Sequence, residues 1–317
     1  MVRVAAVDCG TNSIRLLVAD IDRASGALTD LSRRMEIVRL GYGVDRTGMI
    51  APDAMERTLR VAAEYAGQCR DLGATSVRFV ATSASRDARN AAEFISGVQA
   101  AFDARWGEQV SPEVVSGDEE AALSFAGATG DLAASGVAGP YLVIDLGGGS
   151  TEFVRGTDAV EAARSVNIGC VRLTERHLAS DPPTAAEIAA ATRDIDAAID
   201  LAVERVELRG IRALVGLAGS VTTITAHALH LAAYDPAAIH LARLSVPDVL
   251  ASCDDLLHRT RTERAALPFM HPGRVDVIGA GALVWSRIVV RVVEQTGLTE
   301  VITSEHDILD GIALSQA

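Results

Sequence analysis

Two segments of this chain repeat the same pattern at a spacing of 137 residues: residues 4–14 align without gaps with residues 141–151. Each copy is a short apolar run that ends in Asp, followed by a Gly-rich polar turn with Ser or Thr and a second run. Such a pattern predicts a β-hairpin. Unrelated turns also share Gly and Asp, but here the apolar run, Asp, Gly and Ser all agree in register. The repeat therefore predicts a duplicated domain with a cleft between the halves.

The rest of the sequence alternates strand-like and helical segments, which predicts an α/β fold with largely parallel sheets. The length of 317 residues suits two domains. The Ala-, Gly- and Ser-rich stretch 130–140 is the natural linker, so we expect domains at 1–129 and 130–303, and a last helix at about 304–317 could pack back on the first. Strands are expected at 77–81, 113–116, 163–168, 213–217 and 300–303, and helices at 53–72, 87–105, 118–128, 185–208, 221–232, 246–257 and 275–295.

Composition excludes several classes of protein. Hydrophobic residues make up 49% and charged residues 22%, as in an ordinary globular protein. The net charge of −13 disfavours a nucleic-acid binder, because that affinity comes from basic patches. An anionic ligand must then be held locally by arginines, backbone N–H groups or a metal. The four cysteines are far apart with no C-x-x-C pair, so we expect them reduced, without a zinc site or disulfide framework: Cys9, Cys69, Cys170 and Cys253.

We expect a cytoplasmic protein without a membrane span. The longest strongly apolar stretch begins at Val277 and is interrupted by Arg287 and Arg291, which makes it too short and too charged to cross a bilayer. The N-terminus enters strand-like sequence at once and leaves no room for a signal peptide. A homodimer is compatible with the sequence but not specified by it.

The two hairpin turns carry the chemistry of a phosphate site. Glycines let backbone N–H groups approach an anion closely, and hydroxyl side chains add donors. An Asp that ends a buried strand cannot lie beside phosphate without a cation, and Mg²⁺ held by carboxylates and phosphate oxygens is the usual solution. The alternative is that each Asp caps its own turn. We favour a phosphate clamp with Mg²⁺, Mn²⁺ being an alternative.

Three further segments contribute candidates. Ser116 and Glu119 have capping-box spacing, which leaves Glu120 as a candidate general base unless it only complements the helix dipole. Residues 216–223 end a strand and open a helix, another place for anion donors. Arg86 and Arg172 are candidates for bidentate binding of phosphate through their guanidinium groups, although a lone arginine is often only a solvated surface group.

Other signals are weaker. His227 and His230 are three residues apart on a predicted helix with no evident carboxylate or third ligand, which favours a structural role. The sequence has no G-x-S-x-G, H-E-x-x-H or Walker lysine motif, so serine hydrolases, zincins and Walker-type NTPases are disfavoured.

Taken together, these motifs resemble the exopolyphosphatase / guanosine pentaphosphate phosphohydrolase (Ppx/GppA) family of the actin-like ATPase superfamily. They occur in the family's order and extend from residue 4 to past residue 300. The matching segments are 8–13, 81–86, 116–121, 143–152, 169–173 and 216–220. The resemblance implies two ribonuclease-H-like domains with an interdomain active-site cleft, and hydrolysis of a terminal phosphate of polyphosphate or pppGpp with Mg²⁺.

The resemblance also implies roles for individual residues. Glu120 matches the catalytic base, and Asp8, Asp145 and Glu152 match carboxylates around the metal or the nucleophilic water. Phosphate-contacting positions are matched by Asn12, Ser13, Arg86, Gly147, Gly148, Ser150 and Ser220, and the loops themselves add Gly10, Thr11, Gly149, Thr151 and Gly219. We expect positioning and charge neutralisation rather than a covalent intermediate to supply the catalysis.

Two departures from the family pattern bear on the substrate. Cys9 replaces a more usual aliphatic residue, a small change that leaves the loop intact. Longer relatives have an additional C-terminal helical region without a counterpart here, so we expect short-chain polyphosphate or pppGpp rather than long polymers. Two alternatives remain: a catalytically weak sensor of (p)ppGpp or polyphosphate, and an actin-like ATPase or kinase.

Overall fold

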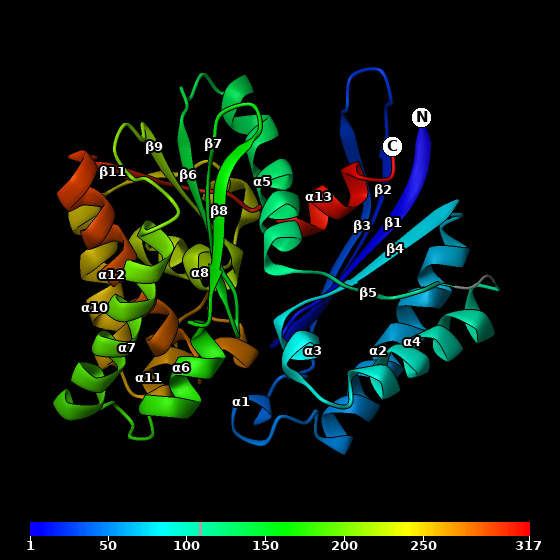
Figure 1. Ribbon diagram of the computed structural model, residues 1–317, viewed down its shortest axis with the longest axis horizontal. Helices are drawn as coiled ribbons and strands as arrows, with labels where there is room; N and C mark the ends of the chain where they lie inside the picture. Colours follow the sequence, from blue (N-terminus) through cyan, green and yellow to red (C-terminus); the bar gives the residue numbers. More distant parts are fainter. Residues whose placement is uncertain (108–109) are drawn as a thin grey trace. The chain divides into compact units, whose positions relative to one another are not determined.

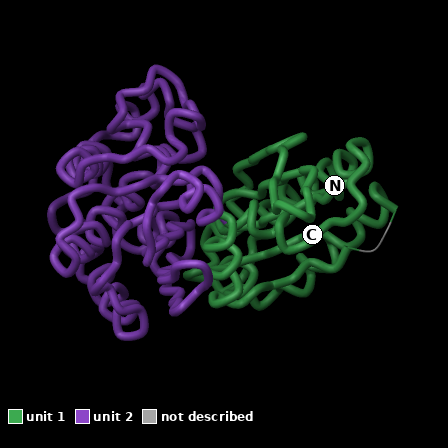
Figure 2. The backbone as a smooth tube through the Cα atoms, turned by 90° about the horizontal axis from the view of Figure 1, so that it is seen from above, with its two compact units in different colours: residues 1–127, 308–317 green, residues 128–307 purple. Residues whose placement is uncertain are grey.

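In the computed structural model, which describes residues 1–107 and 110–317, the chain forms two compact units. Unit 1 comprises residues 1–127 together with 308–317, and unit 2 comprises residues 128–307 (Figure 2). Unit 1 contains a five-stranded sheet and unit 2 a six-stranded sheet, each with flanking helices (Figure 1). The expected α/β fold with two similar halves is confirmed.

The sheet of unit 1 has the strand order β3-β2-β1-β4-β5. The first three strands are antiparallel, and β4 and β5 continue the sheet in parallel. Strand β3 was not expected from the sequence, because most of its side chains are polar and it lies at the sheet edge with little buried surface. The strands are β1 (Val2–Cys9), β2 (Ser13–Ile21), β3 (Leu28–Ile37), β4 (Ser76–Ala81) and β5 (Glu113–Val114).

Alternate residues of β1 supply the two cores of unit 1, since successive side chains of a strand point to opposite faces. Ala5 and Val7 pack in the core formed with α2 (Pro52–Asp71) and α4 (Ala91–Arg105). Val4 and Ala6 pack in the other core, to which α5 (Gly117–Ala134) and α13 (Ile308–Leu314) contribute. At Gly311 a Cβ would lie 2.0 Å from the Leu123 carbonyl oxygen, so only glycine permits α13 to approach α5 this closely.

The sheet of unit 2 has the order β10-β11-β9-β6-β7-β8. From β6 it repeats the plan of unit 1: two antiparallel neighbours on one side (β7, β8) and parallel strands on the other (β9, β11). The strands are β6 (Tyr141–Leu146), β7 (Thr151–Gly156), β8 (Val160–Val166), β9 (Ala213–Leu217), β10 (Arg243–Ser245) and β11 (Glu300–Thr303).

The spacing of 137 residues extends beyond the hairpins. Asp8 lies beside Val80 on β4, and Asp145 lies beside Leu217 on β9, so the neighbouring parallel strands obey the same offset. The same hydrogen bond closes both turns. The N–H of Gly10 donates to the Ser13 carbonyl at 2.9 Å, and the N–H of Gly147 donates to the Ser150 carbonyl at 3.1 Å. Hairpin, turn and parallel neighbour are therefore one repeated unit.

Helices bury the main core of unit 2 against its sheet. They include α6 (Cys170–His177), α7 (Ala185–Val203), α8 (Ala218–Ala228), α10 (Val246–His258) and α12 (Ile278–Thr296). Short helices complete the chain: α1 (Val44–Thr47), α3 (Ser83–Asp87), α9 (Pro236–Ile239), α11 (Arg261–Ala265) and a 3₁₀ turn at Pro272–Arg274. In the part of the chain that the structure describes, we find no helix with the length and apolarity needed to cross a membrane.

Some boundaries differ from expectation. Helix α5 continues to Ala134, into the stretch expected to be linker, because alanines sustain a helix there. The single helix expected at 87–105 is two helices, α3 and α4, interrupted at residues 88–90. All four cysteines are buried and free, as expected.

Candidate active site

The first hairpin carries an ion pair between its strands. Asp8 on β1 lies directly opposite Arg15 on β2. The guanidinium donates to Asp8 Oδ2 from Nε at 2.9 Å and from Nη2 at 2.6 Å. The Asp8 side chain is only 6% exposed, so its charge is balanced within unit 1 by a charge-assisted pair rather than by water. A metal role for Asp8 would have to coexist with Arg15.

The turn at residues 10–13 is oriented by the segment after β3. The carbonyl oxygens of Thr11 and Asn12 accept N–H groups of residues 38, 39 and 41 at 2.8 to 3.0 Å. The Thr11 hydroxyl shares a 2.8 Å hydrogen bond with Ser83 Oγ at the start of α3. Because backbone N–H groups already bind the carbonyl oxygens of this turn, its own N–H groups and hydroxyls can face an anion.

Glu120 lies in the first turn of α5 and is held by Arg86. The Arg86 Nη1 donates to Glu120 Oε2 at 2.6 Å and to the Val115 carbonyl at 2.9 Å. Glu120 is 8% exposed. Because α3 contains both Arg86 and Ser83, contacts run continuously from Thr11 through α3 to Glu120.

The neighbouring carboxylate has a different environment. The N–H of Glu119 donates to Ser116 Oγ at 3.2 Å, which is half of the expected capping box. The Glu119 carboxylate, however, pairs with Arg78 Nη2 at 2.7 Å, and its side chain is 47% exposed. Adjacent residues on one helix turn thus present one exposed and one buried carboxylate.

The second hairpin places two carboxylates where the first has an ion pair. Asp145 on β6 lies directly opposite Glu152 on β7. Both are buried, at 7% and 1% exposure, and Ser165 Oγ donates to Glu152 Oε1 at 2.7 Å. Two acidic side chains directly opposed on antiparallel strands repel each other, and a cation between them relieves the repulsion.

The backbone of the second loop is fixed by the start of α6. The carbonyl oxygens of Gly147 and Gly148 accept N–H groups of residues 170–172 at 2.9 to 3.1 Å. A Cβ on Gly169 would lie 2.4 Å from the carbonyl of Gly148, so the two segments touch through backbone alone. Arg172 is buried and its Nε donates to the Gly149 carbonyl at 2.7 Å. Through this hydrogen bond Arg172 stabilises the loop, in addition to any contact that it makes with phosphate.

A third loop opens α8. Ala218 has φ 68°, an unusual backbone conformation for a non-glycine residue, immediately before Gly219. The Arg274 guanidinium packs so close to Gly219 that a Cβ there would lie 2.6 Å from it. Arg274 also donates to Thr223 Oγ1 at 3.0 Å. Ser220 lies beside buried Cys170, whose thiol pKa is raised mainly by burial.

The structure gathers the expected residues into two sets, each within its own unit. Three residues of these sets were not expected from the sequence: Arg15, Arg274 and Ser165. The repeat could have indicated the first, because Arg15 is the residue 137 positions before Glu152. Unit 1 holds Asp8, Gly10, Thr11, Asn12, Ser13, Arg86 and Glu120; unit 2 holds Asp145, Gly147, Gly148, Gly149, Ser150, Thr151, Glu152, Gly219 and Ser220.

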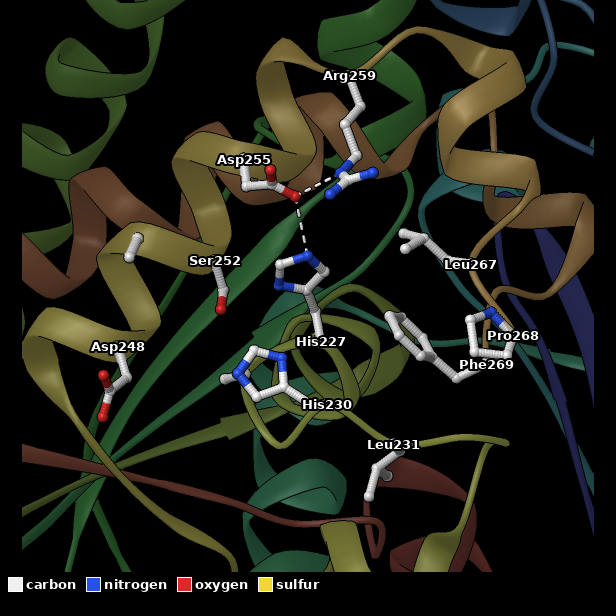
Figure 3. A pocket seen from close by; sticks show the side chains of 12 residues that line it. His227, His230, Leu231, Asp248, Ser252, Asp255, Arg259, Leu267, Pro268 and Phe269 are labelled. Atoms are coloured by element: carbon white, nitrogen blue, oxygen red, sulfur yellow. Dashed lines mark hydrogen bonds and ion pairs between the residues drawn. The ribbon is translucent and has the colours of Figure 1, made fainter.

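A pocket of about 540 Å³ lies elsewhere in unit 2, between α8, α10 and residues 267–269 (Figure 3). No carboxylate partner for His227 was evident from the sequence, but the structure provides one. The Nε2 of His227 lies 2.9 Å from Asp255 Oδ2, and Arg259 contacts the same oxygen. Burial lowers the pKa of His227 although Asp255 opposes the shift. No third candidate metal ligand joins this pair in the described part of the chain.

Comparison with known proteins decides the family. The model of the Ppx/GppA phosphatase family matches residues 17–316. This protein belongs to the Ppx/GppA phosphatase family. Its sequence is 49% identical to exopolyphosphatase 2 of Mycobacterium tuberculosis over 319 residues, with all of this chain and 99% of that protein covered.

Solved structures agree with this assignment. The crystal structure of an exopolyphosphatase-like protein superimposes with a TM-score of 0.92 at 44% identity, covering 99% of this chain and 98% of the other. A Ppx/GppA family member of Aquifex aeolicus gives a TM-score of 0.78 at 28% identity, covering 99% and 97%. The two-unit fold described above is therefore the fold of this family.

Proposed function

We propose that the chain is an exopolyphosphatase, which hydrolyses the terminal phosphoanhydride bond of inorganic polyphosphate and releases orthophosphate. The observation that carries the proposal is the full-length similarity to exopolyphosphatase 2, at 49% identity. The pairing of buried Glu120 with Arg86 supports it, because it gives the chain a fixed carboxylate at the position of the family's base.

Glu120 acts in this proposal as the general base that accepts a proton from the attacking water. A base must have a fixed direction toward that water. The bond from Arg86 fixes Glu120 Oε2, and the first turn of α5 fixes its backbone. Arg86 thereby orients the base in addition to its expected contact with phosphate.

The glycine loops bind the phosphates through backbone N–H groups and hydroxyls. In unit 1 the donors are in loop 10–13, and in unit 2 they are in loops 147–151 and 218–220. Arg274 adds positive charge beside the third loop. Local donors of this kind allow an acidic protein to hold a polyanion.

Asp145 and Glu152 are the residues that would hold Mg²⁺. They offer hard carboxylate oxygens from directly opposite positions of a hairpin, the donor chemistry that Mg²⁺ prefers. When bound, the ion would neutralise negative charge on the phosphate chain. Asp8 is less suited to this task, because Arg15 already balances its charge.

Phosphate release in the presence of Mg²⁺ tests the proposal. The purified protein is compared on short-chain polyphosphate, long-chain polyphosphate, pppGpp and ATP, with Glu120→Gln as the blank. We expect release from polyphosphate, fastest with short chains. Release from pppGpp alone would make the chain a pppGpp phosphohydrolase, release from ATP alone an ATPase, and binding of polyphosphate or (p)ppGpp without any release a sensor.

A further inference from the structure

Unit 2 contains a cluster of two imidazoles and a carboxylate that the proposed reaction does not use. One ligand atom each of Asp131, His240 and His306 lies within 4.8 Å of the other two. His306 Nδ1 lies 2.6 Å and His240 Nε2 lies 3.4 Å from Asp131 Oδ2. The two rings are tilted against each other with centroids 4.5 Å apart. Three donors thus converge on one small volume.

The three donors come from different parts of the chain. Asp131 lies on α5, His240 follows α9, and His306 precedes α13. The boundaries between the two units fall at residues 127/128 and 307/308. Asp131 and His306 are therefore each within a few residues of a boundary, on the unit 2 side. The cluster joins the two connecting segments of the chain within unit 2.

We propose that Asp131, His240 and His306 form a binding site for a borderline transition-metal cation, Zn²⁺ in the first instance. Two imidazoles and a carboxylate are a donor set that zinc takes together with a water molecule. Zinc ligands at about 2.0–2.2 Å from the ion lie roughly 3.3 Å apart in a tetrahedron. The 3.4 Å separation already meets this value, and the 2.6 Å separation needs to widen by less than one ångström.

The site is open to solvent and differs in chemistry from the carboxylate pair of the second hairpin. The side chains of Asp131, His240 and His306 are 45%, 23% and 39% exposed, so an ion can enter without unfolding. Imidazole nitrogen favours zinc and its neighbours over Mg²⁺, which prefers oxygen. The four cysteines are buried and do not compete as exposed thiols.

Metal binding requires a rearrangement at both imidazoles. The proton with which His306 Nδ1 donates to Asp131 Oδ2 at 2.6 Å must move to Nε2 of that ring. The backbone N–H of Glu305 donates to His240 Nδ1 at 3.3 Å, so the ring proton is on Nε2, the nitrogen nearest Asp131. When Nε2 binds an ion, the ring proton must move to Nδ1, and the Glu305 N–H must find another acceptor. At 3.3 Å this hydrogen bond is longer than an ordinary N–H donor bond, so its loss costs little.

Zinc affinity of the untagged, chelator-stripped protein tests the site, measured by competition with a chromophoric chelator in excess Mg²⁺. We expect one Zn²⁺ per chain, and at least about tenfold weaker binding in His306→Gln, His240→Gln and Asp131→Asn. His258→Gln is the matched control, because His258 is exposed and lies 3.2 Å from Asp254 but has no third donor among the residues that the structure describes. Co²⁺ provides a second readout through its visible absorption, which the same three substitutions should abolish.

Absence of Zn²⁺ binding, or equal affinity in wild type and all three variants, overturns the proposal. Equal loss in His258→Gln would also overturn it, because binding would then be distributed over surface histidines. Glu120→Gln should bind Zn²⁺ like wild type, which separates this site from the proposed hydrolysis. Failure of either proposal would leave the other unaffected.

Discussion

Arg15 on β2 and Glu152 on β7 occupy equivalent positions of two equivalent hairpins and carry opposite charges. Each lies directly across from the aspartate that ends the preceding strand, Asp8 in one case and Asp145 in the other. Unit 1 therefore neutralises its own carboxylate, whereas unit 2 places two carboxylates side by side. The duplicated hairpin has diverged into one half in which an arginine faces the aspartate and one half in which a glutamate faces it.

This divergence predicts different effects of two charge-removing substitutions. Glu152→Gln should raise the Mg²⁺ concentration for half-maximal activity at least about tenfold, since it removes one of two opposed carboxylates. Arg15→Gln should leave the Mg²⁺ requirement nearly unchanged. It should instead reduce the free energy of unfolding by about 1–3 kcal/mol, because Asp8 is then buried without its partner. Mg²⁺ titrations of activity and denaturant unfolding of both variants check this, and equal Mg²⁺ curves would contradict it.

A second prediction concerns the orientation of Glu120. In Arg86→Lys a shorter, non-planar ammonium replaces the guanidinium whose Nη1 alone donates to both Glu120 and the Val115 carbonyl, so the base loses its fixed direction. We expect kcat to fall roughly 10²-fold. Arg89→Lys is the matched control, because the Arg89 side chain donates to the Thr47 carbonyl at 3.0 Å. A similar loss in both variants would argue against an orienting role.

A third prediction tests the backbone packing of the second glycine loop. Gly169→Ala would bring a Cβ to 2.4 Å from the Gly148 carbonyl group, which no side-chain movement relieves. We expect a loss of about 1–3 kcal/mol in the free energy of unfolding and weaker polyphosphate binding. Gly67→Ala is the control: it lies inside α2 with open space around it and should stabilise by about 0.5–1 kcal/mol. Thermal unfolding of the two variants should give opposite shifts.

The sequence predicted the parts of the fold that repeat or alternate regularly. The hairpins and their turns could be recognised because the 137-residue spacing brings Asp8 and Asp145 into register. Strand β3 could not, because an exposed edge strand buries too few side chains to leave an apolar pattern. The sequence also did not predict that α5 continues to Ala134. A stretch of alanine and glycine between two elements is compatible with a linker as well as with a helix.

Residue types at the candidate site were predictable, but their partners were not. Sequence motifs indicated Glu120 and Arg86 separately, and only the fold brings them to 2.6 Å. Arg274 lies 55 residues beyond Gly219 in the sequence and packs on it through tertiary structure alone. The cluster of Asp131, His240 and His306 is likewise assembled from segments that share no local motif.

A fourth prediction concerns acid stability. Glu187 accepts the N–H of Thr184 at 2.7 Å and those of residues 179 and 180, which lowers its pKa from 4.5 to about 2. A lowered pKa in the folded state means that the carboxylate stabilises the protein above pH 4.5 and loses this contribution as the pH falls toward 2. Glu187→Gln should therefore be less stable than wild type at neutral pH. The difference should shrink through that acid range, as measured by denaturant unfolding at several pH values, and a constant difference would contradict the assignment.

The role of Glu120 as general base is tested most directly by comparing Glu120→Gln with Glu119→Gln on short-chain polyphosphate with Mg²⁺. Both remove one carboxylate from the same helix turn, but only Glu120 is buried against Arg86. If Glu120 is the base, Glu120→Gln binds polyphosphate with wild-type affinity and releases orthophosphate at least about 10²-fold more slowly, while Glu119→Gln retains wild-type turnover. Wild-type turnover in Glu120→Gln would contradict it.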